Sequence, residues 1–481
     1  MRQTIFRMQV PEGYILISKV EYEQLLNRLT MMEAHIKKQE DRIKELEAML
    51  NKDSHNSHKP PGSDGYKKKI KNNRESSGKK AGGQLGHEGK TLQTVENPDK
   101  VIEHKVECCG HCGTDLKNIK AKKYYRKQVH DLPPIKIEVT EHREEVKQCH
   151  VCGKETIAES GIPASVQYGE RIKSMGVYLN QYQMLPFERT RETMEDLFEC
   201  SISAEVLQQS NELCYDHLEE KVEKEIKESI IQSAVMHNDE TGIRCEGKTQ
   251  WVHVNSTQQH TYYAIDEKRG KEAMDRINIL PRFTGNTVHD RWASYEKYGQ
   301  CDHNYCNAHT LRDLKFVGEE LQKPWAAQMQ TILLNAYDLS KQEQTNQDEI
   351  TAIEKKYDEI VNQGIKQEPL PLAAIHKRGR KAKGKSLKLL ECFRDKKKEY
   401  MGFLYDKNIP FDNNLAERDL RMVKLKQKIS GCFRTRKGAE IFCRIRSYIS
   451  TLKKQGEDIW DALQLSIKPT SLQHIMLRGG E

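Results

Sequence analysis

Residues 233–309 carry the pattern that most restricts the possible folds of this chain. Five short segments there alternate apolar and polar residues as strands do, and a helix-like piece, residues 271–279, separates the third segment from the fourth. The five segments are residues 234–237, 251–255, 261–265, 287–289 and 303–306. Three antiparallel strands, a crossover helix and then a fourth strand predict an α+β core.

Three acids occur in comparable settings. Asp239 comes two residues after the first segment, in Ala-Val-Met-His-Asn-Asp-Glu-Thr-Gly (234–242), and we expect that strand to end at this carboxylate. Asp290 follows the fourth segment. Glu417 lies in residues 411–422, which begin like a helix capped by Asp412. The strand order is that of a ribonuclease-H-like core, and it places Asp239 and Asp290 on neighbouring strands.

Two strand-borne aspartates and a helical glutamate can hold two divalent cations about 4 Å apart, an arrangement that clamps the attacking and leaving oxygens of a phosphodiester. Each acid taken alone is explained as well by an ordinary surface carboxylate. The metal hypothesis therefore depends on the three contexts together.

The charge is modest overall but clustered. The chain has 79 Lys and Arg against 71 Asp and Glu, a net charge of +8. Basic blocks occupy residues 59–80, 376–400 and 418–437, which favours a nucleic acid partner over merely solvated loops and helix faces. The cations that we expect to contact DNA are Lys67, Lys68, Lys69, Arg378, Arg380, Lys381, Arg418, Arg421, Lys424 and Lys428.

A heptad seam runs through the N-terminal region. Apolar residues recur at alternating spacings of three and four from Tyr22 to Leu50, and Gln39 is the one polar interruption. A helix with so narrow an apolar face cannot bury it alone. We expect a coiled coil that forms a homo-oligomer, with folding against the body as the alternative.

Two Cys-x-x-C pairs predict a zinc-binding module. Cys109 and Cys112 form the first pair, Cys149 and Cys152 form the second, and each pair is followed by glycine. Four thiolates suit a structural Zn²⁺ and leave no open position for catalysis. We expect residues 124–146 to form hairpin strands between the pairs, and Cys108 to stand outside the ligand set.

Helices are expected elsewhere. Residues 187–198 and 204–218 flank a short turn, as in a helix-turn-helix or in an ordinary helix pair. A helical insertion is expected at 318–400, with helical structure over 326–361 and a DNA-facing segment over 376–398, and an amphipathic helix over 441–455 closes the chain. His303, Cys306 and His309 could bind a metal, but without a clear fourth ligand we favour a packing or hydrogen-bonding role.

No apolar run is long enough to cross a membrane and no signal peptide is evident, so we expect a cytoplasmic protein associated with the bacterial nucleoid, its 13 cysteines reduced or metal-bound. The expected organisation is an N-terminal segment and coiled coil (1–50), a basic linker (51–100), a zinc-binding module (101–160), a helical region (161–228), the first part of the core (229–317), a helical insertion (318–400), the catalytic helix with the rest of the core (401–465) and a tail (466–481).

This order of parts resembles the transposases of the insertion sequence 66 family over nearly the whole chain. The resemblance rests on seven motifs: Lys-Pro-Pro-Gly-Ser-Asp-Gly (59–65), Gly-Gly-Gln-Leu-Gly-His-Glu-Gly (82–89), the two cysteine pairs, His-Asn-Asp-Glu-Thr-Gly (237–242), Asp-Arg-Trp-Ala-Ser-Tyr (290–295), Cys-Asn-Ala-His (306–309) and Asp-Asn-Asn-Leu-Ala-Glu-Arg (412–418). The doubled cysteine at 108–109 and Gly62-Ser63, where two serines are more usual, depart from the family pattern.

The resemblance implies a DDE-type enzyme with Asp239, Asp290 and Glu417 as its catalytic acids. These would hold Mg²⁺ or Mn²⁺, cut DNA at the transposon ends to leave 3′-hydroxyls, and join those hydroxyls to target DNA, with possible accessory transposition proteins. A non-catalytic zinc-containing DNA-binding protein, such as a regulator or a transposase relic, is the alternative. A structure-specific nuclease on the same fold is the third interpretation.

Overall fold

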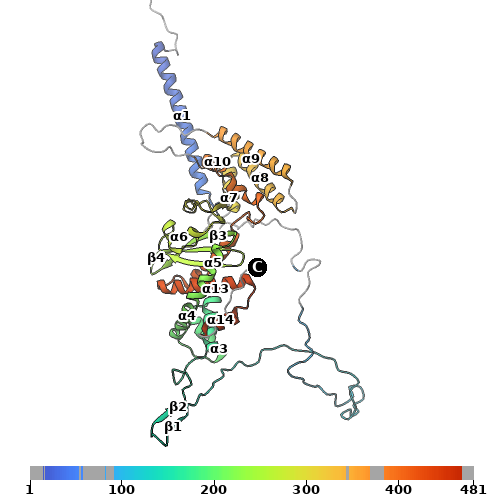
Figure 1. Ribbon diagram of the computed structural model, residues 1–481. Coiled ribbons are helices and arrows are strands. Elements are labelled where there is room, and N and C mark those ends of the chain that lie inside the picture. The colour runs from blue at the N-terminus through green and yellow to red at the C-terminus, as the bar shows by residue number, and fades with distance from the viewer. Residues whose placement is uncertain are drawn as a thin grey trace, which may run out of the picture.

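The computed structural model describes residues 13, 15, 17–53, 56, 57, 82, 91–342, 346–368 and 384–468. A mixed sheet lies at the centre of the body, helices pack around it, and one long helix, α1 (Lys19–Leu50), projects from one end (Figure 1). The architecture is therefore α+β. None of the helices in these ranges combines the length and the apolar content that a membrane span requires.

The central sheet has five strands in the order β5-β4-β3-β6-β7. The strands β3, β4 and β5 pair antiparallel, and β6 and β7 join β3 in parallel. Their bounds are β3 (Val235–Cys245), β4 (Lys248–Ser256), β5 (Thr261–Asp266), β6 (Asn286–His289) and β7 (Asp302–Tyr305). The crossover from β5 to β6 contains α6 (Lys271–Ile277), so the five predicted strands and the crossover helix are confirmed.

The first strand is longer than the sequence suggested. It continues past Asp239 to Cys245, so the prediction that the strand ends at this carboxylate is wrong. The alternation persists because Ile243 and Cys245 are buried under the helical layer. The strand ends at a two-residue hairpin loop, where Glu246 and Gly247 have φ of +52° and +72°, as the loop twist of a tight hairpin requires.

Helices cover both faces of the sheet. On one face, Ile243, Val252 and Val254 pack against α12 (Asn414–Ser430) and the first turns of α13 (Arg436–Gln455). On the other face, Met236 and Tyr262 pack against α5 (Lys224–Ile231) and α6. The closing helix was predicted from residue 441, but α13 begins five residues earlier because the Thr435 side chain caps it by accepting from the Gly438 N–H.

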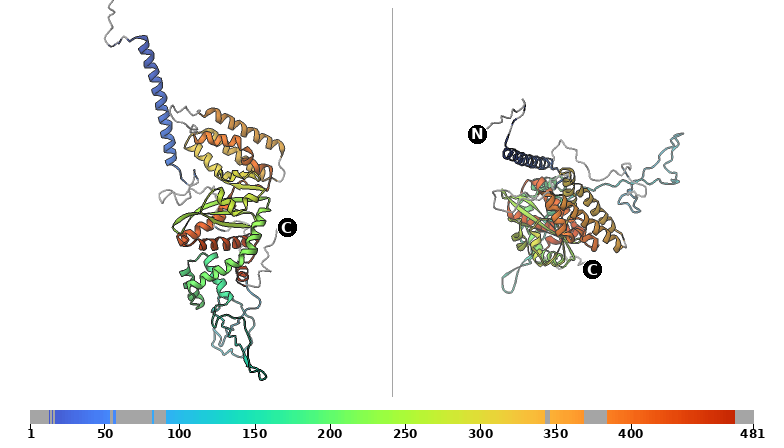
Figure 2. Two further views of the ribbon diagram at one scale, coloured as in Figure 1. Left: turned by 60° about the vertical axis from the view of Figure 1, so that its left-hand side comes forward. Right: turned by 90° about the horizontal axis from the view of Figure 1, so that it is seen from above.

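A second helical group packs beyond β7, at the end of the body from which α1 projects (Figure 2). It contains α7 (Asn307–Glu319), α8 (Pro324–Ser340), α9 (Gln347–Gln367), α10 (Lys385–Asp395) and α11 (Lys397–Tyr405). The region predicted to be helical over 326–361 contains two helices, since α8 ends at Ser340 and Asn346 caps the start of α9. The basic residues Arg378, Arg380 and Lys381 lie outside the described residues.

The helix pair predicted before the sheet is present as α3 (Phe187–Phe198) and α4 (Ala204–Leu218), and Ser203 caps α4 as expected. Around this pair lie α2 (Glu170–Val177), α14 (Ile459–Ile467) and two π-helical turns, Tyr178–Tyr182 and Glu219–Glu223. The sequence of α4 contains no Lys or Arg, and its exposed residues include Glu205 and Asp216. That face is poorly suited to DNA phosphates.

The region before residue 165 has little buried surface. Its two short strands, β1 (Val146–Gln148) and β2 (Glu155–Ile157), pair antiparallel around the second cysteine pair. The strands predicted over 124–146 are absent apart from Val146, the first residue of β1, so that prediction is wrong. Three of its apolar side chains, those of Val129, Leu132 and Val139, are 85–91% exposed and are not buried against any other element.

Candidate active site

The sheet register places Asp239 opposite Asp290. Parallel pairing of β3 with β6 joins Val235 to Asn286 and His237 to Val288, an offset of 51 residues, since 286 − 235 = 51. Asp239 and Asp290 have the same offset, 290 − 239 = 51. Extending the register by two residues therefore sets the two carboxylates side by side on one face of the sheet. The side chain of Asp290 also accepts from the Trp292 N–H at 2.9 Å, which fixes the turn after β6.

Glu417 comes to this edge in the first turn of α12. Buried Ala416, Leu420 and Val423 hold the helix on the sheet, on the face that carries Asp239. Asp412 was predicted as the cap, and its carboxylate does accept from the Asn414 N–H at 3.0 Å. The residue at the cap position, however, is Asn413.

Asn413 fastens the start of α12 to the sheet. It is 1% exposed, and its amide contacts His237 Nδ1 at 2.9 Å and donates to the Asn238 carbonyl at 2.8 Å. Because the amide nitrogen is used in the second bond, its oxygen faces His237, which must carry its proton on Nδ1. Burial lowers the pKa of His237, so this ring is neutral at physiological pH.

The three acids influence one another electrostatically. Burial raises the pKa of Asp239 well above its usual value, and the charges of Glu240, Asp290 and Glu417 raise it further, while a hydrogen bond from the Glu240 N–H opposes them. Like charges act in this way only when they lie close together. The structure thus brings together the three acids that the sequence singled out, around a position where a cation would relieve their repulsion.

The neighbouring carboxylate, Glu240, points to the opposite face and already has a cation. Its side chain is 2% exposed, and Arg269 Nη2 lies 2.7 Å from one of its oxygens. The Tyr295 hydroxyl donates to the other oxygen. Burial raises the pKa of Glu240, and the hydrogen bonds from Tyr295 and Arg269 oppose that rise.

Arg269 and Tyr295 connect Glu240 to the segment after Asp290. The Arg269 guanidinium lies between two indole rings, 4.9 Å from the centroid of Trp251 and 4.3 Å from that of Trp292. Because Trp292 donates to Asp290 and Tyr295 donates to Glu240, the turn carrying Asp290 is held from two sides. Sequence reasoning missed this support, whose only local signal was the pair of aromatic residues in the motif 290–295.

The Cys-Asn-Ala-His motif lies at the start of α7, beside Glu417. The Asn413 N–H donates to Cys306 Sγ at 3.1 Å, and His309 Nδ1 lies 3.6 Å from Glu417 Oε1. One ligand atom each of Cys306, His309 and Glu417 falls within 4.8 Å of the others. His303 is not part of this group, because its ring bonds His289 and the Tyr298 carbonyl.

The predicted DNA-contacting cations divide into two sets. Arg418, Arg421, Lys424 and Lys428 are exposed on α12, where Lys424 also donates to the Gly242 carbonyl at 2.7 Å. In the described part of 376–398, three lysines form ion pairs: Lys385 with Asp313, Lys397 with Asp358 and Lys398 with Asp302. Lys388 is exposed and Lys398 is 79% exposed, so the expectation that this segment faces DNA stays a prediction.

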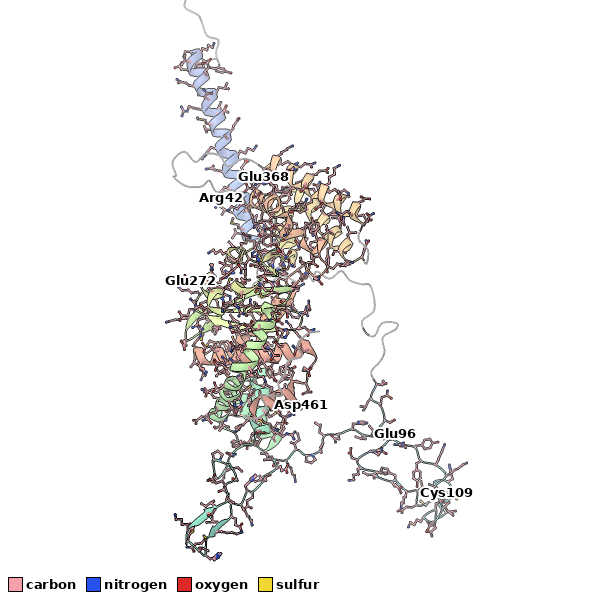
Figure 3. All side chains as sticks on the ribbon, in the orientation of Figure 1. Arg42, Glu96, Cys109, Glu272, Glu368 and Asp461 are labelled. Atoms are coloured by element: carbon pink, nitrogen blue, oxygen red, sulfur yellow. The ribbon has the colours of Figure 1, made fainter. Side chains whose placement is uncertain are left out.

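The two cysteine pairs adopt the same turn. The Cys109 N–H donates to Thr114 and the Gly113 N–H to Cys109, just as Cys149 pairs with Lys154 and Gly153. The glycines have φ of +75° and +69°. Hydrogen bonds with Thr114 lower the pKa of Cys112 to about 7. Cys109 lies on a loop apart from the β1–β2 hairpin (Figure 3), and the four-thiolate site stays a prediction.

Lys67, Lys68 and Lys69 fall outside the described residues, as do the motifs 59–65 and most of 82–89.

Comparison with known families identifies the family of the chain. The profile of the transposase IS66 family matches residues 165–441, a range that covers more than half of the chain and contains the positions of Asp239, Asp290 and Glu417. A second profile, for a family of unknown function designated DUF6444, matches residues 14–93, which include α1. No curated protein matches the chain. Since the first match spans the helical region, the sheet and α12, this chain belongs to the IS66 family of transposases.

Proposed function

We propose that this transposase is a DDE-type enzyme with a ribonuclease-H-like core, in which Asp239, Asp290 and Glu417 hold two divalent cations and act on the ends of a transposon. The observation that carries the proposal is the convergence of three acids from β3, the end of β6 and the first turn of α12. Burial raises the pKa of Asp239, the charges of Glu240, Asp290 and Glu417 raise it further, and none of the described contacts of that side chain is with a cationic group.

The donor set fits Mg²⁺ or Mn²⁺, since carboxylate oxygens are the ligands these hard cations prefer. When bound, the metal supplies Lewis acidity and lowers the pKa of water. The protein's own part is positional. The register of β3 with β6 sets the two aspartates, Asn413 sets the start of α12, and the helix N-terminus adds partial positive charge near the phosphates.

DNA binding is assigned to the exposed cations of α12 together with the basic blocks at 59–80 and 376–400. Arg418, Arg421, Lys424 and Lys428 continue along the helix that carries Glu417, so a phosphate chain lying on them would reach the acids. The zinc-binding module, residues 101–160 as proposed, would add a further contact. The other proposed domains have the residue ranges that the sequence predicts.

Zinc is proposed to bind Cys109, Cys112, Cys149 and Cys152, supported by the shared turn geometry of the two pairs. The test is zinc stoichiometry in Cys109→Ser, with Cys108→Ser as the matched control. We expect the first variant to lose zinc and end binding while the second keeps both. The reverse result would assign Cys108, in place of Cys109, as the zinc ligand.

The experiment that tests the catalytic proposal is cleavage and joining of a labelled duplex that carries the element's own end, for wild type beside Glu417→Gln. Mg²⁺-dependent nicks and joined products that Glu417→Gln removes are the expected result. Nicks without joined products would favour the nuclease. Tight end binding without chemistry in Mg²⁺ or Mn²⁺ would favour a DNA-binding relic and contradict the proposal.

A further inference from the structure

The long helix α1 presents an apolar face that the described body leaves uncovered. Its eight apolar seam side chains are between 45% and 84% exposed, and the one buried side chain described on the helix is Ala48. The helix starts firmly, because Ser18 and Glu21 form a reciprocal capping box. Such a stripe on a helix of 32 residues requires a partner.

We propose that α1 pairs with α1 of a second copy as a parallel, in-register, two-stranded coiled coil. This deepens the proposed function, because it gives the homo-oligomer a defined arrangement, and its link to DNA-end pairing rests on that function. The seam places Tyr22, Leu29, Ile36, Ile43 and Leu50 at the a positions of the heptad and Leu25, Met32, Gln39 and Leu46 at the d positions. In parallel coiled coils, isoleucine at a with leucine at d favours two strands, and Ile43 with Leu46 follows this pattern.

The polar seam residue selects the orientation. In a parallel, in-register pair, Gln39 faces Gln39 of the second copy, and the two amides can bond each other. In an antiparallel pair centred on the seam, Gln39 would lie among Met32 and Ile36 of the other helix. A buried amide without a polar partner costs about 1–3 kcal/mol, so the parallel pair is preferred.

The flanking charges select the same orientation. In a parallel pair, each g position faces the following e position of the other helix. This sets Arg28 against Glu33 and Arg42 against Glu47, two opposite-charge contacts on each side of the seam. An antiparallel pair would set Arg28 near Arg42 and Glu33 near Glu40, which are like-charge contacts.

The C-terminal end of α1 contacts the body, so the orientation of the two paired helices determines where the two bodies lie. Ala48 belongs to the core of the helical group, Asn51 Nδ2 donates to Glu320 Oε2 at 3.2 Å, and Lys52 lies over the Phe316 ring. These contacts are at the end of α7, whose start lies beside Glu417, one helix length of about 20 Å away.

A parallel pair therefore holds both catalytic bodies at the same end of the coiled coil. An antiparallel pair would separate them by the length of α1, about 48 Å. The parallel arrangement suits two active sites that act on two DNA ends.

The test measures the mass of the full chain by sedimentation, without DNA or metal. We expect a dimer of about 112 kDa, twice the 55.9 kDa chain. Met32→Asp places a charge in the seam and should weaken self-association at least tenfold. The matched control, Met31→Asp, changes the adjacent methionine, which is 75% exposed and lies off the seam, and should leave the dimer intact.

Orientation is tested with charge reversals and a cross-link. Arg28→Glu with Arg42→Glu should weaken the dimer, as should Glu33→Arg with Glu47→Arg, and mixing the two double variants should restore it. A photo-reactive residue in place of Tyr22 should link to residues 19–26 of an isotopically labelled second copy.

A monomeric wild type, a dimer that survives Met32→Asp, or cross-links from position 22 to residues near 50 would each overturn the proposal. Because no DNA is present, such a failure is distinct from a failure of the cleavage chemistry.

Discussion

Two adjacent carboxylates of β3 lie on opposite faces of the sheet and differ in the charges that surround them. Glu240 faces α6 and the segment after Asp290, where Arg269 and Tyr295 supply a cation and a hydrogen-bond donor. Asp239 faces α12, and the charges that raise its pKa, those of Glu240, Asp290 and Glu417, are all negative. The comparison teaches that sequence position alone does not identify a metal ligand. The acid whose charge the protein leaves uncompensated is the better candidate.

The largest expected effect is on strand cleavage, and it concerns the acids on the face of the sheet that carries Asp239. Asp290→Asn and Glu417→Gln should each lower strand cleavage by at least about 10³-fold, because each removes a negatively charged ligand that electrostatic stabilisation of the reaction requires. End binding should change little, since neither acid is a phosphate contact. Lost binding with a normal cleavage rate per bound complex would contradict the assignment.

Metal bound by Asp239, Asp290 and Glu417 should stabilise the wild-type fold. A bound cation relieves carboxylate repulsion, and a ligand at 100 times its Kd adds about 2.7 kcal/mol to the free energy of unfolding. Thermal unfolding in Mg²⁺ against EDTA measures this gain for wild type and Asp239→Asn. An equal gain in the two proteins would place the bound metal elsewhere.

On the face of the sheet that carries Glu240, Arg269→Ala should lower the free energy of unfolding by about 2 kcal/mol, because it leaves the buried Glu240 without its cation. The loss is smaller than for a fully buried pair, since the Arg269 side chain is 41% exposed. Arg276→Ala, which breaks a similar but more exposed pair with Asp266, is the matched control and should cost under about 1 kcal/mol. Chemical denaturation compares the two; equal losses would remove the special role of Arg269.

The smallest expected effect is that of Tyr295→Phe. Removal of one hydroxyl that donates to Glu240 should cost about 1–2 kcal/mol and slow cleavage a few fold by loosening the turn that carries Asp290. Tyr298→Phe removes a hydroxyl that donates to the more exposed Asp275 at 2.7 Å, and it should leave cleavage unchanged. Cleavage rates and denaturation curves for the pair separate a positioning role from a general loss of stability.

Much of the core could be predicted because its information is local. Alternation along β4 and β5, the length of the crossover and the cap at Ser203 are all readable from neighbouring residues. The end of β3 was misjudged because two acids in sequence suggested a strand terminus, whereas Ile243 and Cys245 continue the buried face.

The supports of the acids could not be predicted in the same way. Arg269 reaches Glu240 across 29 residues, Tyr295 across 55, and Asn413 reaches His237 across 176. Such pairs follow from the packed fold and have no periodic signal. The lysines of α10 and α11 illustrate the same limit, since Lys385 and Lys397 pair with acids that are distant in sequence.

The most direct test of the account compares strand cleavage by wild type, Asp239→Asn and Glu240→Gln in Mg²⁺, on the element's own end, with the folded fraction of each variant measured in parallel. The account predicts that Asp239→Asn loses at least about 10³-fold, whereas Glu240→Gln stays within about tenfold of wild type per folded molecule. Equal losses, or a larger loss in Glu240→Gln, would contradict the assignment of the catalytic face.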